Sequence, residues 1–115
     1  MPDKPLITVV TPVMNEEENI VLFYEAVAKV TDSLDSFAWE FLFIDDGSTD
    51  RSFELMMQLH EQDPRVRALQ LSRNFGSYPA IRAGFEHARG DAVIAISCDL
   101  QDSPEVFVQF TELWQ

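Results

Sequence analysis

Residues 6–16 read Leu6-Ile7-Thr8-Val9-Val10-Thr11-Pro12-Val13-Met14-Asn15-Glu16, an apolar, β-branched run that passes directly into a polar loop. Apolar runs with little alternation are typical of strands that are covered on both faces. Residues 41–44 and 93–96 show the same pattern, whereas residues 66–71 alternate, which suits a strand at the edge of a sheet. The sequence therefore predicts parallel-sheet strands at these places.

Apolar side chains at helical spacing lie between the strands and after the last one. The predicted stripes are Ile20, Phe23, Tyr24, Val27 and Leu34; Phe53, Met56, Met57 and His60; Ala80, Ile81, Gly84, Phe85 and Ala88; and, after Ser103-Pro104, Val106, Phe107, Phe110 and Trp114. We expect Asn15, followed three residues later by Glu18, to cap the first helix.

Alternating strands and helices favour a single open α/β domain over residues 1–115. We expect three layers, with a parallel sheet in the order 3-2-1-4, helices on both faces and right-handed crossovers, as in Rossmann-like folds.

The charge balance restricts the partners of the protein. Twenty Asp and Glu residues against eight Lys and Arg residues give a net charge of -12, which repels nucleic acid and excludes it as a partner. A phosphate ligand would need a cation beside it. The single cysteine, Cys98, fits a reducing compartment. The first residues do not resemble a signal peptide, and no apolar run is long enough to span a bilayer. These features predict a cytoplasmic location.

Three polar loops follow the first, second and fourth predicted strands, at residues 12–16, 45–50 and 97–102. In open parallel sheets the carboxyl ends of the strands meet at one edge, and ligands bind where the strand order reverses. Clustered carboxylates repel one another unless a cation or hydrogen-bond donors offset their charge, and oxygen ligands favour Mg²⁺ or Mn²⁺. The alternative is that these residues only form turns and helix caps.

Neither a G-x-G-x-x-G motif nor a P-loop is present, so a phosphate would be held by metal and scattered donors. At this point the sequence resembles family 2 glycosyltransferases of the GT-A fold, in the branch that glycosylates polyprenyl phosphates. The matching segments, in order, are VVTPVMNEEENI (9–20), FIDDGSTD (43–50), LSRNFG (71–76), ARGDA (88–92) and DLQDSPE (99–105).

The resemblance implies a nucleotide-sugar site made of Pro12, Met14, Glu16, Ile44, Asp46, Arg73, Ser97 and Gln101. In it, Pro12 and Glu16 border the base, and Asp46 recognises a uracil- or guanine-like edge. Asp99 is implied as the ligand of Mg²⁺ or Mn²⁺, with Gln101 beside the sugar or metal and Arg73 near phosphate.

Two departures from the family pattern affect these expectations. Ser97 stands where the family's Asp-x-Asp motif has its first carboxylate, so we expect weaker metal binding. Family members are also considerably longer, so we expect this chain to be the donor-binding half, without the acceptor half, the catalytic base or C-terminal membrane helices. Such helices would place the full-length protein at the cytoplasmic face of the membrane, and the open sheet edge or last helix would allow a homo-oligomer.

Two functions remain open. The first is metal-dependent, inverting transfer of a sugar, from a UDP-sugar in our interpretation, to a polyprenyl phosphate. The second is a non-catalytic module that binds a nucleotide or a partner. A response-regulator-like phosphoacceptor is disfavoured, because it needs a lysine at a later strand end and the only lysines are Lys4 and Lys29.

Overall fold

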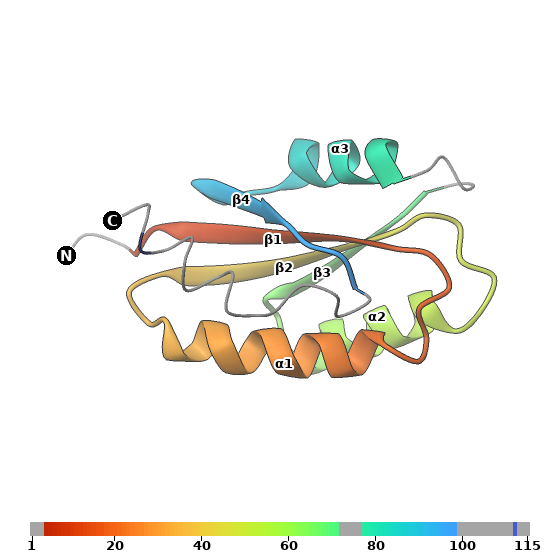
Figure 1. Ribbon diagram of the computed structural model, residues 1–115, viewed down its shortest axis with the longest axis horizontal. Helices are drawn as coiled ribbons and strands as arrows, with labels where there is room; N and C mark the ends of the chain where they lie inside the picture. The colour runs from red at the N-terminus through yellow and green to blue at the C-terminus, as the bar shows by residue number, and fades with distance from the viewer. Residues whose placement is uncertain (1–3, 72–76, 99–111, 113–115) are drawn as a thin grey trace.

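The computed structural model describes residues 4–71, 77–98 and 112 of the chain. Strands and helices alternate along it, as the apolar runs predict (Figure 1). Among the helices of these segments, none is both long and apolar enough to cross a membrane. The elements are β1 (Leu6–Val13), α1 (Ile20–Ser33), β2 (Ala38–Asp45), α2 (Ser52–Gln62), β3 (Val66–Gln70), α3 (Ser77–His87) and β4 (Ala92–Ala95).

The strands form one parallel sheet in the order β3-β2-β1-β4, which confirms the predicted order. Strand β1 pairs with β2 from Leu6 opposite Ala38 to Val13 opposite Asp45, and with β4 on its other side. The strand order therefore reverses at β1, where open α/β sheets bind ligands beyond the carboxyl ends of the strands.

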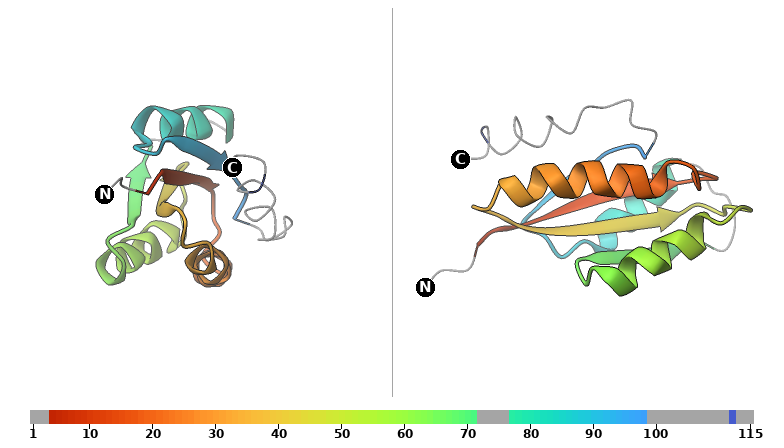
Figure 2. Two further views of the ribbon diagram at one scale, coloured as in Figure 1. Left: turned by 90° about the vertical axis from the view of Figure 1, so that its left-hand side faces the viewer. Right: turned by 90° about the horizontal axis from the view of Figure 1, so that it is seen from below.

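Helices α1 and α2 cover one face of the sheet and α3 covers the other, so the predicted three layers are confirmed (Figures 1 and 2). The larger core cluster contains buried residues of α1 and α2, and in it the rings of Phe23 and Phe43 meet edge to face at 6.2 Å. The smaller cluster joins Val10, Leu42 and Ile44 of the sheet to Ala80 of α3. Burial on both faces explains why β1 and β2 read as continuous apolar runs.

Strand β3 lies at one edge of the sheet and pairs with β2. Its middle residues Arg67, Ala68 and Leu69 are only partly buried. The alternating sequence of residues 66–71 predicts this edge position, and the structure confirms it.

The predicted cap of the first helix is wrong. Helix α1 begins at Ile20, and its N-cap residue, Asn19, makes no side-chain capping hydrogen bond. Asn15 instead has a positive φ of 53°, and its side chain accepts a hydrogen bond from the backbone N–H of Thr49 at 2.8 Å. Asn15 therefore contacts the β2–α2 loop and not the start of α1, because a turn at residues 16–19 separates Asn15 from the helix.

Two predicted helical stripes are also partly wrong. Helix α2 buries Met56 and Leu59, whereas Met57 is 39% exposed. Helix α3 buries Ala80, but Phe85 is 52% exposed. A helix that packs on one sheet face buries a narrow stripe, and a residue next to a buried one is turned about 100° away from it.

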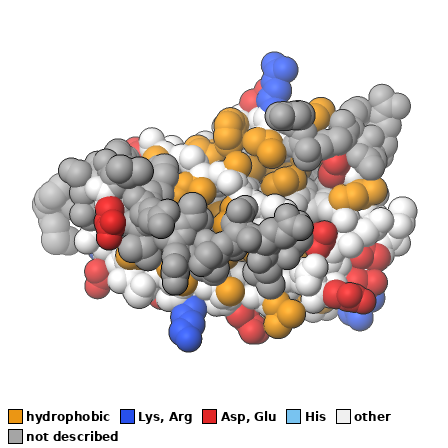
Figure 3. Space-filling view, viewed as in Figure 1, with side chains coloured by type: hydrophobic (Ala, Val, Ile, Leu, Met, Phe, Trp, Pro, Cys, Tyr) orange, Lys and Arg blue, Asp and Glu red, His pale blue; other side chains and the backbone are white. Residues whose placement is uncertain are grey.

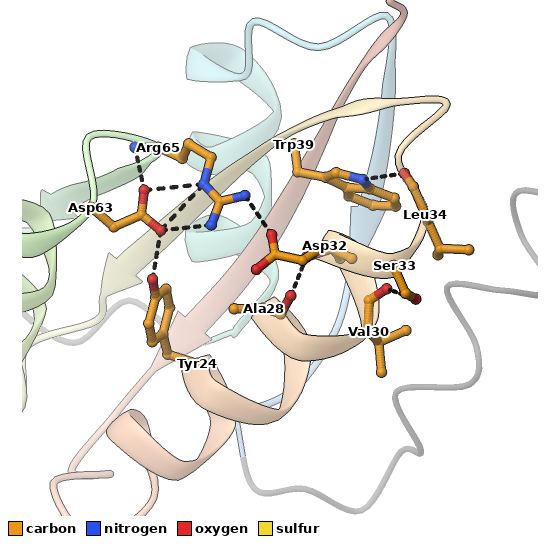
Figure 4. Close-up of polar contacts among 10 residues, drawn as sticks. Tyr24, Ala28, Val30, Asp32, Ser33, Leu34, Trp39, Asp63 and Arg65 are labelled. Atoms are coloured by element: carbon orange, nitrogen blue, oxygen red, sulfur yellow. Dashed lines mark hydrogen bonds and ion pairs between the residues drawn. The ribbon is translucent and has the colours of Figure 1, made fainter.

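Asp63, just after α2, connects Tyr24 of α1 to Arg65, the residue before β3 (Figure 4). It accepts hydrogen bonds from the Tyr24 hydroxyl at 2.5 Å and from the Arg65 guanidinium at 2.9 Å. Arg65 also pairs with Asp32 at 2.9 Å and lies over the ring of Phe41. Burial alone would raise the pKa of Asp63, but the hydrogen bonds from Arg65 and Tyr24 outweigh it and lower that pKa to about 2.

A second buried carboxylate, Glu40, connects the strands near their amino ends. It accepts hydrogen bonds from the Thr8 hydroxyl at 2.6 Å and the Arg89 backbone N–H at 3.1 Å, and it pairs with Arg67. Burial would raise the pKa of Glu40, but these hydrogen bonds outweigh it and lower the pKa. The α3–β4 connection is thereby attached to the centre of the sheet.

Candidate functional site

A pocket of about 180 Å³ opens at the carboxyl ends of β1, β2 and β4. Its walls come from the three loops that the sequence predicts to meet. The lining residues are Pro12, Val13, Met14, Glu16, Asp46, Ser97 and Cys98. Complete sites for small ligands measure roughly 300–1,000 Å³, so this pocket suits one part of a larger ligand, such as a planar base.

Asp45 ends β2 and Asp46 follows it; both side chains are buried, but only Asp46 lines the pocket. Asp45 has no exposed surface, and its carboxylate accepts hydrogen bonds from the Ser48 backbone N–H at 3.0 Å and from the Gln70 side chain at 3.4 Å. Asp46 lines the pocket, and its backbone N–H donates to the Val13 carbonyl at 2.8 Å. Successive side chains of a strand point to opposite sides, so Asp45 supports the turn while Asp46 faces the ligand space.

The end of β1 and the β1–α1 loop form another part of the lining. Pro12 and Glu16 are half-buried, and Met14 is 36% exposed. The Glu16 carboxylate accepts a hydrogen bond from the Asn19 amide at 2.8 Å. The backbone N–H of Glu16 donates to the Ser52 hydroxyl at 2.8 Å, which attaches this wall to the start of α2.

The third wall follows β4. Ser97 is exposed at the pocket, and the Cys98 thiol is buried beside it. Asp99, Gln101 and Arg73, which the sequence places in the metal and phosphate part of the site, lie outside the described residues.

The structure brings Pro12, Met14, Glu16, Asp46 and Ser97 together around one pocket. Ile44 is not among the lining residues; it has no exposed surface and packs in the smaller core cluster. Val13 and Cys98 line the pocket without having been predicted. In the sequence, only their positions next to predicted site residues could have indicated Val13 and Cys98 as lining residues. Their side chains lack the polar groups that are typical of a base-binding site.

Acidic side chains gather next to the pocket. A second hollow of about 360 Å³ lies beside it, lined by Asn15, Glu16, Glu17, Glu18, Asn19 and Asp50. Figure 3 shows acidic side chains gathered at the end of the molecule where the β1–α1 and β2–α2 loops lie. Burial would raise the pKa of Asp50, but hydrogen bonds from Ser52 and Glu17 outweigh it and lower that pKa. In the part of the chain that is described, no group of three or more His, Cys, Asp or Glu side chains is arranged to hold a metal.

These walls can recognise neutral N–H donors through carboxylate oxygens, but they repel an unscreened phosphate. A phosphate ligand at these loops would therefore need a cation beside it.

Comparisons with known proteins agree with this geometry. The model of the family "Glycosyl transferase family 2" matches residues 8–115. A prophage bactoprenol glucosyl transferase homolog of Escherichia coli (strain K12) is 46% identical over 109 residues, which cover 95% of this chain and 35% of that protein. An undecaprenyl-phosphate 4-deoxy-4-formamido-L-arabinose transferase of Salmonella choleraesuis (strain SC-B67) is 44% identical over 100 residues, which are 86% of this chain and 30% of that one.

Among solved structures, a mannosyltransferase from Pyrobaculum calidifontis in complex with GDP-Man and Mn²⁺ superposes with a TM-score of 0.79. The match covers 96% of this chain and 32% of that one, at 20% sequence identity. This likeness confirms the predicted fold, a GT-A-like parallel sheet in the order 3-2-1-4 with helices on both faces. The chain spans about a third of the length of the curated relatives that it matches. Because the family model covers nearly the whole chain, the protein belongs to glycosyl transferase family 2.

Proposed function

We propose that this chain binds the donor in a metal-dependent, inverting transfer of a sugar from a UDP-sugar to a polyprenyl phosphate. The observation that carries the proposal is the pocket at the point where the strand order reverses, lined by Asp46 and Glu16 from two different loops. Polyprenyl phosphate as the acceptor is supported by the names of two relatives, a bactoprenol glucosyl transferase homolog and an undecaprenyl-phosphate transferase.

Asp46 is the residue that we propose to recognise the base. A carboxylate only accepts hydrogen bonds, and the ring N–H groups of uracil and guanine are donors that match it. Met14, with its polarizable thioether at the pocket wall, provides a surface on which a flat ring packs.

Metal dependence is supported by charge. The protein carries a net charge of -12, and Glu16, Glu17 and Asp50 line the hollow next to the pocket, so a diphosphate needs a cation to approach. The oxygen donors around the pocket suit Mg²⁺ or Mn²⁺ better than zinc. We propose Asp99 as the protein ligand; Ser97, two positions earlier in the chain, is exposed. A bound divalent ion would neutralise charge that develops on the leaving diphosphate.

In the proposed reaction, a phosphate oxygen of the acceptor forms a bond to the anomeric carbon from the face opposite the diphosphate. The bond from that carbon to the diphosphate oxygen breaks, and its electron pair leaves with the nucleoside diphosphate. An acceptor phosphate is already anionic, so this step needs no strong base. We place the whole protein at the cytoplasmic face of a membrane, where a polyprenyl phosphate would present its head group.

Calorimetric titration tests donor binding. UDP-glucose and GDP-mannose are titrated into the protein with and without Mn²⁺. We expect metal-dependent binding of the UDP-sugar, and about ten-fold weaker binding by Asp46→Asn, because the base loses a charged hydrogen-bond partner. Asp99→Ala should remove the effect of Mn²⁺.

Glu25→Gln is the matched control, since it removes one exposed carboxylate of α1 that does not line the pocket. It should bind like the wild type. Absence of metal-dependent binding by the wild type, or equal binding by Asp99→Ala, would contradict the donor site. A separate assay with polyprenyl phosphate measures transfer, and donor binding without transfer would instead favour the binding module.

A further inference from the structure

Asn15 lies between two residues of the pocket wall but is not part of that wall. Met14 and Glu16 line the pocket, whereas the Asn15 side chain points to the β2–α2 loop. Its backbone has a φ of 53°, the left-handed region that asparagine adopts more readily than most residues with a side chain.

The Asn15 side chain provides acceptors that the facing loop lacks. Its Oδ1 accepts hydrogen bonds from the backbone N–H groups of Thr49 at 2.8 Å and Asp50 at 3.3 Å. Its own backbone N–H donates to the Ser48 hydroxyl at 2.9 Å. Thr49 and Asp50 precede α2, which begins at Ser52, so the helix provides no carbonyl acceptor for their N–H groups.

The loop that Asn15 holds carries the residue that we propose to recognise the base. Asp46 begins this loop, and Gly47, with a φ of 83°, turns it. On the buried side, Asp45 accepts a hydrogen bond from the Ser48 backbone N–H at 3.0 Å. The loop is thus held by Asp45 on one side and by Asn15 on the other. The Asn15 contact adds to the backbone hydrogen bonds from Asp46 to Val13 and from Glu16 to Ser52, which also join the two segments.

We infer that Asn15 is a positioning residue of the nucleotide pocket: it holds the β2–α2 loop against the β1–α1 loop so that Asp46 and Glu16 face the same base. The inference rests on the proposed function. Asn15 itself does not touch the ligand. Without its acceptor, the two loops sample more separated arrangements, and the apparent affinity falls with the fraction of molecules that remain competent to bind.

The test is Asn15→Gly, because glycine keeps the positive φ and removes only the side-chain acceptor. Calorimetry with UDP and with GDP, both in Mn²⁺, should show about ten-fold weaker binding of whichever nucleotide the wild type prefers. Asn15→Asp keeps an acceptor oxygen and tolerates positive φ, so it should bind within about three-fold of the wild type. Circular dichroism verifies that each variant is folded at the titration temperature.

Asp63→Asn is the control for a general loss of stability, because Asp63 belongs to the contacts between α1 and β3 and not to the pocket. It should keep the wild-type affinity. Wild-type affinity in Asn15→Gly, or the same loss in Asn15→Asp as in Asn15→Gly, would overturn the inference alone. Binding of neither UDP nor GDP by the wild type would overturn the proposed function, and this inference with it.

Discussion

Asp63 is the residue whose ionisation contributes most clearly to stability. Its pKa is lowered from 3.8 to about 2, with burial opposing the change and hydrogen bonds from Arg65 and Tyr24 producing it. A lowered folded-state pKa stabilises the protein above the unfolded-state pKa, and this contribution is lost as the pH falls from about 4 to about 2. A shift of this size corresponds to about 2 kcal/mol.

We therefore expect Asp63→Asn to lower the free energy of unfolding by about 2 kcal/mol at neutral pH and to flatten its dependence on pH between about 4 and 2. Urea denaturation at several pH values measures both effects. Asp32→Asn is the control, because the Asp32 side chain is 61% exposed and also pairs with Arg65. It should change stability much less, and an equal loss in the two variants would contradict this account.

At the scale of elements, the approach of α3 to the sheet depends on Gly84. A Cβ atom at this position would lie 2.3 Å from a methyl carbon of Val10, in the middle of β1. Val10 is fully buried and β-branched, so it cannot move aside cheaply. Gly84→Ala should therefore destabilise the fold by about 1–3 kcal/mol, although alanine is the better helix former by about 1 kcal/mol.

Thermal and urea denaturation of Gly84→Ala, Val10→Ala and the double variant measure this contact. The double variant should lose less stability than the sum of the two single losses, because removal of the Val10 methyl groups makes room for the new one. Additive losses, or a stabilised Gly84→Ala, would show that α3 is not held this close to β1.

At the scale of the whole molecule, net charge opposes compactness. Twenty acidic side chains face eight basic ones, and the acidic loops meet at one end of the sheet. Raising NaCl from about 10 mM to about 150 mM shortens the Debye length from about 30 Å to about 8 Å. We expect the melting temperature to rise by about 2–5 °C, because screening weakens this repulsion more than it weakens the few surface ion pairs.

Differential scanning calorimetry measures this rise. The control variant Glu25→Gln/Glu61→Gln removes two exposed helix carboxylates and should show a smaller rise, since less repulsion remains to be screened. A melting temperature that is flat or falls with salt would show that attractive ion pairs dominate.

The sequence predicted those strands whose residue pattern is set by burial on both faces. Residues 6–13 and 38–45 are buried on both faces, so their apolar runs identified two central strands. Prediction was poorer on the helices: the apolar side chains of Met57 and Phe85 fit a stripe at helical spacing, yet both are exposed. Apolar spacing reveals that a helix is amphipathic, but the partner surface decides how wide the buried stripe is.

The sequence by itself determined the parallel strands, because apolar runs that alternate with helical stripes follow from local pattern and chain connectivity. The order 3-2-1-4, and with it the meeting of three polar loops, came from the likeness to Rossmann-like sheets, since right-handed crossovers permit more than one order. Only the tertiary structure decided the role of Asn15. Its spacing to Glu18 matched a helix cap, yet its side chain binds Thr49, 34 positions further along the chain. The backbone donors before α2 come within reach of Asn15 only when the sheet has brought β1 and β2 side by side, so no local pattern could reveal that contact.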